Sequence, residues 1–303
     1  MAKVIARIRG GLGNQLFCYA AARRLALVNR SELVIDDVTG FARDSQYRRK
    51  YTLDHFSIQA RKATAAERLE PFERYRRGMH KFISRQRPFL NRTYVEQEGI
   101  DFDPRLLSYR PSTKVYLDGL WQSEGYFKDV EKTIREDLRI IPPSDAVNLQ
   151  MAEKIRNCRA VALHVRFFDA PGSTSPHNVT SDYYQRAIAM MEERIDSPHY
   201  FLFSDNAEAA RSKLSLPEGR VSFVTHNQGD EYAYADLWLI TLCQHYITAN
   251  STFSWWGAWL GENEKSIVLV RNFTPDGNAT SWCFDGLIPD RWTLVSFGGC
   301  SGL

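Results

Sequence analysis

Short apolar segments alternate with helical segments twice along this chain of 303 residues, and this rhythm most restricts its fold. Strands that alternate with helices form parallel sheets, because each crossover helix returns the chain to the same end of the sheet. Pro142-Pro143 interrupts the rhythm near the middle, and proline cannot continue a helix. A chain of this length also exceeds one hydrophobic core. The sequence therefore predicts an α/β fold with two Rossmann-like lobes, residues 1–145 and 146–303.

The expected elements place several polar segments at strand ends. In the first lobe we expect strands at 4–8, 33–35 and 115–117, and helices at 14–29, 63–90 and 126–138. In the second lobe we expect strands at 160–165, 200–203, 221–224, 246–249 and 267–270, and helices at 182–193, 232–243 and 253–260. Ligands of such sheets bind beyond the carboxyl ends of the strands. That rule points to residues 10–15, 164–169, 204–206 and 250–254.

A glycine-rich loop, Gly10-Gly11-Leu12-Gly13-Asn14-Gln15, joins the first expected strand to the first expected helix. Glycines let the backbone approach a ligand, and a helix N-terminus offers N–H donors to anions. The dinucleotide fingerprint G-x-G-x-x-G fails, because Leu16 stands where its third glycine would be. Asn14 and Gln15 are candidates to bind a sugar or a phosphate, and a purely structural tight turn is the alternative.

The segment His164-Val165-Arg166 ends a predicted strand, on which residues two apart share a face. Asp169 follows, where it is expected to hold the guanidinium of Arg166. Arginine suits phosphate, since it offers two parallel hydrogen bonds. When a diphosphate leaves a sugar its negative charge grows, so an arginine there stabilises the transition state most. The alternative is a structural Arg–Asp pair beside a core histidine.

Other polar residues fall at or near strand ends in the second lobe. Asn250-Ser251-Thr252-Phe253 joins a strand to a Trp-rich helix, where Ser and Thr either cap the helix or help to bind an anion. Asp205 and Asp236 are candidates to bind the ribose or the base of a nucleotide. His177 is a candidate general base, because imidazole titrates near neutral pH, or else an exposed loop histidine.

No metal ion or cofactor is expected. Asp101-Phe102-Asp103 matches the Asp-x-Asp pattern of cation-binding sugar transferases, but Pro104 follows it and favours a turn. Cationic side chains and helix N-termini can neutralise a diphosphate instead. The five cysteines are odd in number and widely spaced, which favours free thiols. With no signal segment before the first strand, a cytoplasmic protein is expected.

The charge distribution bears on the partners. A net charge of +3 is too small to favour nucleic acid. Basic residues concentrate in residues 43–92, which hold 14 of the 39 Arg and Lys. This stretch fits a solvated helical surface, a phosphate-bearing acceptor, or a peripheral contact with the anionic inner face of a membrane.

Taken together, the motifs resemble the bacterial α-1,2-fucosyltransferases, glycosyltransferase family 11, over nearly the whole chain. Besides the His164 segment, the resemblance rests on IRGGLGNQLF at 8–17, YLDGLWQSEGYF at 116–127, SDYY at 181–184, FSD at 203–205 and ANSTFSWWGAWL at 249–260. The first and last of these motifs are long and specific.

The resemblance implies the GT-B arrangement, in which two lobes face a cleft, with the acceptor mainly in the first lobe and GDP-fucose mainly in the second. It implies inverting transfer of L-fucose to the 2-hydroxyl of a terminal β-galactoside on a free or lipid-linked glycan. Arg166 would contact the diphosphate, Asp169 would orient that arginine, and Ser251 and Thr252 would bind phosphate. The full set of candidate donor-binding residues is Gly11, Gly13, Asn14, Gln15, His164, Arg166, Asp205, Asp236, Asn250, Ser251, Thr252 and Phe253.

One segment departs from the family. Its members commonly read His-x-Arg-Arg-Gly-Asp-Tyr, whereas Phe167, Phe168 and Ala170 replace the second Arg, the Gly and the Tyr here. The first Arg and the Asp remain, so donor activation is expected. Two alternatives stay open: another GDP-sugar transferase of this fold, for example one acting on peptide hydroxyls, and a non-catalytic nucleotide-sugar-binding protein. An NAD-linked oxidoreductase is disfavoured by the missing glycine.

Overall fold

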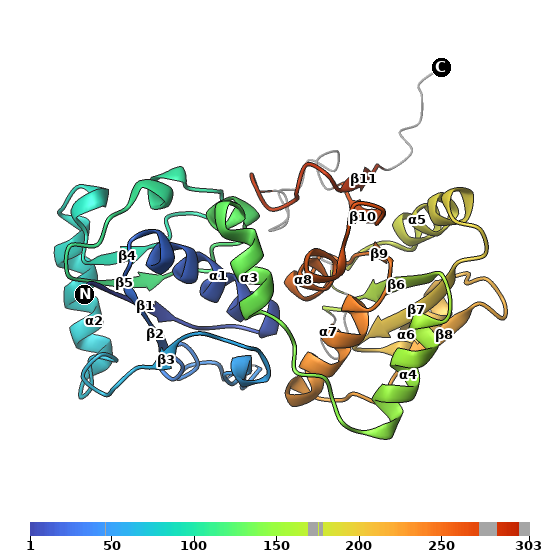
Figure 1. The fold of residues 1–303 in the computed structure, drawn as a ribbon, viewed down its shortest axis with the longest axis horizontal. Coiled ribbons are helices and arrows are strands. Elements are labelled where there is room, and N and C mark those ends of the chain that lie inside the picture. Colours follow the sequence, from blue (N-terminus) through green and yellow to red (C-terminus); the bar gives the residue numbers. More distant parts are fainter. Residues whose placement is uncertain (46, 169–174, 176–177, 273–283, 297–303) are drawn as a thin grey trace, which may run out of the picture. The chain divides into compact units, whose positions relative to one another are not determined.

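The computed structural model describes residues 1–45, 47–168, 175, 178–272 and 284–296. The chain forms two compact units, Met1–Ile141 with Phe284–Ile288 (the first unit) and Pro142–Cys283 with Pro289–Leu303 (the second unit). Each unit holds one parallel sheet with helices packed on it (Figure 1). The predicted fold class, two Rossmann-like α/β lobes of the GT-B type, is confirmed.

Five parallel strands in the order β3-β2-β1-β5-β4 form the sheet of the first unit. They are β1 (Lys3–Arg7), β2 (Glu32–Asp36), β3 (Arg61–Lys62), β4 (Tyr94–Glu96) and β5 (Lys114–Asp118). The α-helices are α1 (Leu12–Val28), α2 (Glu73–Arg85) and α3 (Glu131–Asp137). Short 3-10 helices are η1 (Leu53–His55), η2 (Phe89–Asn91), η3 (Pro104–Ser108), η4 (Glu124–Tyr126) and η5 (Lys128–Val130).

Two helix predictions in the first unit were too long. In the stretch 63–90 only α2 is α-helical, because Pro71 and Pro88 lie just outside its two ends and proline does not continue a helix. In the stretch 126–138 only α3 is α-helical, and 3-10 turns precede it. The strands β3 and β4 were missed, since two or three residues carry no readable alternation.

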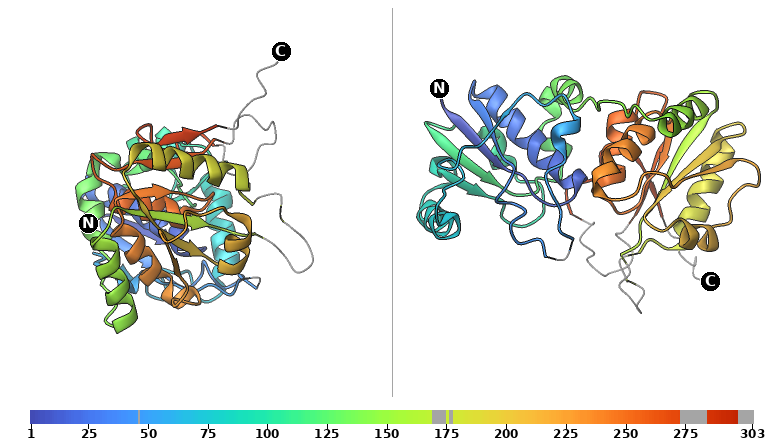
Figure 2. Two further views of the ribbon diagram at one scale, coloured as in Figure 1. Left: turned by 90° about the vertical axis from the view of Figure 1, so that its right-hand side faces the viewer. Right: turned by 90° about the horizontal axis from the view of Figure 1, so that it is seen from below.

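Six parallel strands in the order β11-β10-β9-β6-β7-β8 form the sheet of the second unit. They are β6 (Ala160–Val165), β7 (His199–Ser204), β8 (Val221–Val224), β9 (His245–Ile247), β10 (Val268–Arg271) and β11 (Thr293–Val295). The helices are α4 (Ala146–Arg156), α5 (Ser181–Arg194), α6 (Ala207–Lys213), η6 (Asp230–Tyr232), α7 (Ala233–Thr241) and α8 (Thr252–Gly261). Helices α7 and α8 cover one face of this sheet and α5 covers the other (Figure 1 and Figure 2).

The strand order of the second unit reverses between β6 and β9. From β6 the chain builds outward through β7 and β8, then returns to the other side of β6 for β9, β10 and β11. Every residue of β6 is buried, so the reversal lies over the centre of the core. Such a switch point leaves space beyond the carboxyl ends of the two central strands, where doubly wound sheets bind their ligands.

The first unit is discontinuous in sequence, because Phe284–Ile288 belongs to it. The prediction had instead assigned all of residues 146–303 to the second lobe. The contacts of Phe284–Ile288 place this segment with the first unit. The Phe102 N–H donates to the Asp285 carbonyl at 3.1 Å, and the Asp285 N–H donates to Asp101 Oδ1 at 3.1 Å. Asp103 caps η3 by accepting from the Arg105 N–H at 3.0 Å. The carboxylates of Asp101 and Asp103 thus accept hydrogen bonds from the backbone N–H groups of Asp285 and Arg105. This is in keeping with the turn that the sequence favoured.

Candidate active site at the switch point of the second sheet

His164 sits on β6, one residue before the strand ends. Its ring is buried and lies with its centroid 5.5 Å from that of Phe253, at the start of α8. Burial, assisted by the charge of Arg166, lowers the pKa of His164 to about 3. Among the described residues, its Nδ1 atom has no hydrogen-bond partner. A neutral imidazole with an unused nitrogen is suited to hydrogen-bond a polar ligand, and it carries no charge at neutral pH.

Arg166 follows β6 and is held by Asp205, which follows β7. The Nη1 atom of Arg166 lies 2.9 Å from Asp205 Oδ2, and the Phe167 N–H donates to Asp205 Oδ1 at 3.1 Å. About 30% of the Arg166 side chain and 31% of the Asp205 side chain are exposed. The guanidinium is therefore fixed at one nitrogen and still accessible to an anion, as a diphosphate ligand requires.

The two phenylalanines that replace the family's Arg-Gly have different environments. The ring centroid of Phe168 lies 5.5 Å from the guanidinium carbon of Arg166. The backbone N–H of Phe168 donates to Asn178 Oδ1 at 2.7 Å. Phe167 packs on the core of the second unit, with Lys213 Nζ 4.7 Å from its ring. Phe168 thus supports the guanidinium of Arg166 by a cation–π contact, while Phe167 completes the edge of the core.

Two predicted catalytic residues, Asp169 and His177, lie outside the described residues. The pairing of Asp169 with Arg166 therefore stays a prediction, as does the role of His177 as a general base. In the part of the chain that is described, Asp205 is the carboxylate that pairs with Arg166.

The segment Asn250–Phe253 follows β9 and begins α8. Ser251 is the N-cap, and its Oγ accepts from the Phe253 N–H at 3.3 Å. Asn250 is buried, whereas Ser251, Thr252 and Phe253 are partly exposed. Because β9 pairs directly with β6, the N-terminus of α8 opens beside the end of the strand that carries His164. A helix N-terminus of this kind is suited to bind phosphate.

Asp236 on α7 belongs to a polar cluster that the sequence did not reveal in full. Asn227 Nδ2 donates to Asp236 Oδ1 at 2.8 Å, and the amides of Asn227 and Asn148 exchange hydrogen bonds of 2.9 and 3.0 Å. His226 Nε2 lies 3.1 Å from Asn148 Oδ1. Burial raises the pKa of Asp236 to about 7, although the Asn227 amide partly opposes this. A carboxyl poised near neutrality is typical of functional sites.

The rule that ligands bind beyond the carboxyl ends of parallel strands also points to part of this cluster. His226 and Asn227 lie in the loop after β8, beyond the end of a strand that was predicted at 221–224. Asn148 could not be found in that way, because α4 was not predicted.

The glycine loop of the first unit is organised by Gln15. Its amide nitrogen donates to the Gly10 carbonyl at 2.9 Å and to the Lys50 carbonyl at 2.8 Å, and its oxygen accepts from the Thr52 N–H at 3.0 Å. Gln15 is buried, so these contacts favour the structural alternative for this residue.

Its neighbours in the loop are more accessible. Asn14 is half-buried and accepts from Gln122 Nε2 at 2.7 Å. The Arg49 guanidinium lies against Gly11, where an added Cβ would come within 1.7 Å of Arg49 Nη1. Gly13 is buried within α1. The loop therefore combines a helix N-terminus with a nearby cation.

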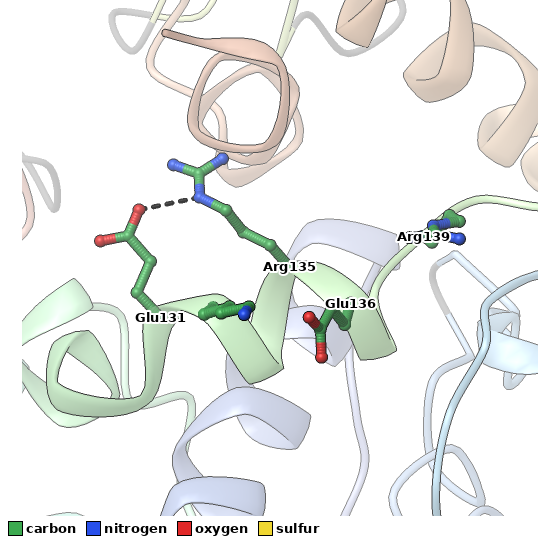
Figure 3. A pocket seen from close by; sticks show the side chains of 5 residues that line it. Glu131, Arg135, Glu136 and Arg139 are labelled. Atoms are coloured by element: carbon green, nitrogen blue, oxygen red, sulfur yellow. Dashed lines mark hydrogen bonds and ion pairs between the residues drawn. The ribbon is translucent and has the colours of Figure 1, made fainter. Parts of the chain in front are cut away.

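A pocket of about 500 Å³ lies elsewhere, along α3 in the first unit (Figure 3). Charged side chains line it, and Glu131 and Arg135 pair across one helical turn at 2.8 Å. None of the predicted site residues is among its lining residues, which are Glu131, Lys132, Arg135, Glu136 and Arg139. In the described ranges, no group of three or more His, Cys, Asp or Glu side chains is placed to hold a metal ion.

Several known proteins are similar to this chain over most of its length. Residues 3–285 match the family model for glycosyl transferase family 11. An alpha-1,2-colitosyltransferase of Escherichia coli is 27% identical over 278 residues, which cover 89% of this chain and 91% of the relative. The O-antigen biosynthesis glycosyltransferase WbnK of Escherichia coli is 29% identical over 286 residues, covering 86% and 91%.

Among solved structures, an Arabidopsis thaliana FUT1 mutant in complex with GDP superposes with a TM-score of 0.52. The match covers 90% of this chain and 71% of that one, at 16% sequence identity. At this identity the likeness shows a shared fold.

Proposed function

This chain belongs to glycosyl transferase family 11, and we propose that it transfers L-fucose from GDP-fucose to the 2-hydroxyl of a terminal β-galactoside. The family supports sugar transfer, and the name of one relative specifies an α-1,2 linkage. A fold of the same kind has been solved with GDP, which supports a guanine nucleotide donor. The acceptor is a free or lipid-linked glycan.

One observation carries the proposal: an accessible arginine stands beside a helix N-terminus at the switch point of the second sheet. Arg166 and the first N–H groups of α8 supply positive charge for the diphosphate of the donor. As the acceptor oxygen bonds to C1 of fucose, the C1–O bond to the β-phosphate breaks and its electron pair goes to the diphosphate. The growing negative charge strengthens these contacts in the transition state, which lowers the barrier without a divalent cation.

The remaining site residues take supporting roles in this proposal. Asp205 holds Arg166 in place, and Asp169 is proposed to orient the same arginine. Because Asp205 is committed to Arg166, Asp236 is the better candidate to accept hydrogen bonds from the guanine edge. His177 is the candidate to take the acceptor proton. Inversion at C1 follows from a single displacement of this kind.

The experiment is to replace Arg166 by alanine and measure GDP release and product formation with GDP-fucose and lactose. We expect kcat to fall by about 10²- to 10³-fold, since one charge-stabilising donor is lost from the leaving group. Arg186→Ala removes an exposed arginine of the same unit, paired with Asp182 on α5, and is expected to leave kcat unchanged. Near-full transfer by Arg166→Ala would overturn the assignment.

A second candidate donor follows from the relative that transfers colitose. The same assay with a nucleotide-activated colitose separates the two, because the better donor is the one with the larger kcat/KM. Linkage analysis of the product tests the 2-hydroxyl as acceptor, and a peptide substrate tests the alternative of a peptide-modifying transferase. GDP binding without turnover of either donor would favour a non-catalytic binding protein.

A further inference from the structure

Helix α2 packs against the rest of the first unit through its polar face. Ser84 is buried and its Oγ accepts from the Tyr94 N–H at 2.8 Å. Lys81 Nζ lies 3.0 Å from Asp118 Oδ2, and Arg77 Nη2 donates to Thr39 Oγ1 at 2.7 Å. A surface helix of a globular protein normally buries its apolar face. Here ion pairs and hydrogen bonds fasten the helix to the unit instead.

The opposite face of α2 exposes large apolar side chains. Phe72 is 77% exposed, Tyr75 70% and Phe82 68%. Met79 and Ile83 are exposed as well. The spacings of three and four residues put Tyr75, Met79, Phe82 and Ile83 on one face of the helix, and Phe72 directly precedes its first turn. Single exposed apolar residues are ordinary, but a row of aromatic and aliphatic side chains marks an interaction surface.

Basic residues surround this apolar row. Residues 72–87 contain six Arg or Lys and one acidic residue, Glu73. Arg74, Arg76 and Arg85 are exposed beside the row. Across residues 43–92 the 14 basic residues outnumber five acidic ones, a net charge of +9, whereas the whole chain carries +3. The surroundings of the row are thus complementary to an anionic surface.

We propose that the outward face of α2 binds a membrane rich in anionic phospholipids, with the helix axis in the plane of the interface. Aromatic and aliphatic side chains on one face and arginines beside them are the composition of interfacial helices. The 13 residues of α2 span about 20 Å, less than the roughly 30 Å of a bilayer core. No described helix is long and apolar enough to cross a membrane.

Charge decides between lipid and a second copy of the chain as the occupant. Two copies that meet through α2 would bring their arginines together, and like charges repel. Anionic headgroups would instead neutralise the same arginines, while the rings of Phe72, Tyr75 and Phe82 enter the headgroup region. This proposal concerns binding and does not depend on the identity of the donor sugar.

The test is sedimentation of the full-length protein with vesicles of phosphatidylglycerol and phosphatidylcholine, and with vesicles of phosphatidylcholine alone. We expect binding to the anionic vesicles at least tenfold stronger than to the neutral ones, and weaker as salt is raised. The triple variant Phe72→Ser, Tyr75→Ser, Phe82→Ser should lose at least tenfold in vesicle affinity while its melting temperature stays near that of the parent. Arg74→Glu with Arg87→Glu should also weaken binding.

A matched control uses exposed apolar residues of the second unit. Val147→Ser with Leu149→Ser changes two exposed side chains of α4 and should leave vesicle binding unchanged. Two results would overturn the proposal: equal binding of the parent and the triple variant to anionic vesicles, or no vesicle binding by a parent whose α2 row instead mediates dimers in sedimentation velocity.

Discussion

At the scale of the residue, the buried Asp118 and the half-buried Asp236 show how neighbouring groups set the charge of a carboxyl. Burial alone would raise the pKa of Asp118, but Arg7 and Lys81 outweigh it and hold the pKa far below its usual range. Asp236 has an amide beside it and no described cation pairs with it, so burial raises its pKa to about 7. Asp118 is therefore ionised and structural, whereas Asp236 is available to change its protonation state near neutral pH.

The raised pKa of Asp236 predicts a dependence of stability on pH. The folded state holds this proton up to about pH 7, while the unfolded carboxyl releases it near its ordinary pKa of 3.8. The contribution to stability is therefore complete below about pH 4 and is lost as pH rises to about 7. Asp236→Asn removes this loss, so relative to the parent it should gain about 1–3 kcal/mol between pH 5 and pH 8. Urea unfolding at both pH values measures the difference, and a pH-independent difference would contradict it.

Gln15 gives a second test at this scale, of structure against ligand binding. Gln15→Leu leaves the carbonyls of Gly10 and Lys50 and the N–H of Thr52 without their partner. Unfolding free energy should fall by about 2–4 kcal/mol, since buried polar groups are costly to leave unpaired. Exposed Gln59→Leu serves as the control in the same urea titration. A variant of unchanged stability that binds GDP more weakly would instead assign Gln15 to the donor site.

The ion pair between Arg166 and Asp205 shows which kind of contact one sequence cannot predict. Spacing made Asp169 an expected partner, and it lies outside the described residues, whereas the described partner, Asp205, is 39 positions away at the end of β7. Both strand ends were predicted correctly. Their contact depends on the register that pairs Val165 with Ser204, and no pattern within either strand carries that information.

At the scale of the element, apolar strands were predictable and polar elements were not. Strand β6 has the predicted bounds, because six consecutive apolar or buried positions stand out between polar segments. Strand β3 consists of Arg61 and Lys62, and it is a strand only because it pairs with β2. Helix α4 was missed because several charged and amide residues interrupt its apolar positions. Pairing with a neighbouring strand stabilises β3, although the conformational preference of its own residues does not predict a strand.

Helices α7 and α8 pack closely because one of them carries a glycine at the contact. A Cβ added to Gly257 would lie 2.4 Å from Ile240 Cγ2, so Gly257→Ala must push the helices apart. We expect a loss of about 1–3 kcal/mol in unfolding free energy. Gly78→Ala in α2 is the matched control, since nothing lies within 4 Å of its added Cβ. Alanine there should be neutral or stabilising by up to about 1 kcal/mol, and equal effects at both sites would contradict the packing argument.

At the scale of the whole molecule, each unit has its own sheet and its own core, so a ligand of one unit need not stabilise the other. Saturating GDP should slow amide hydrogen exchange at the ends of β6 and β7 and in the first turn of α8. The interior of β1 and β5 should exchange at an unchanged rate and acts as an internal reference. Protection confined to the first unit would move the donor site away from the switch point.

The discontinuity of the first unit has a consequence for biosynthesis. Phe284–Ile288 supplies the partners of the Phe102 N–H and of the Asp101 carboxylate, yet residues 142–283 of the second unit are translated before this segment exists. On the ribosome, the second unit emerges while the first still lacks its closing segment. Because domains otherwise tend to fold in the order of their synthesis, the nascent first unit must wait until residues 284–288 have been made. A fragment that ends at Ile141 would keep that unfinished state permanently.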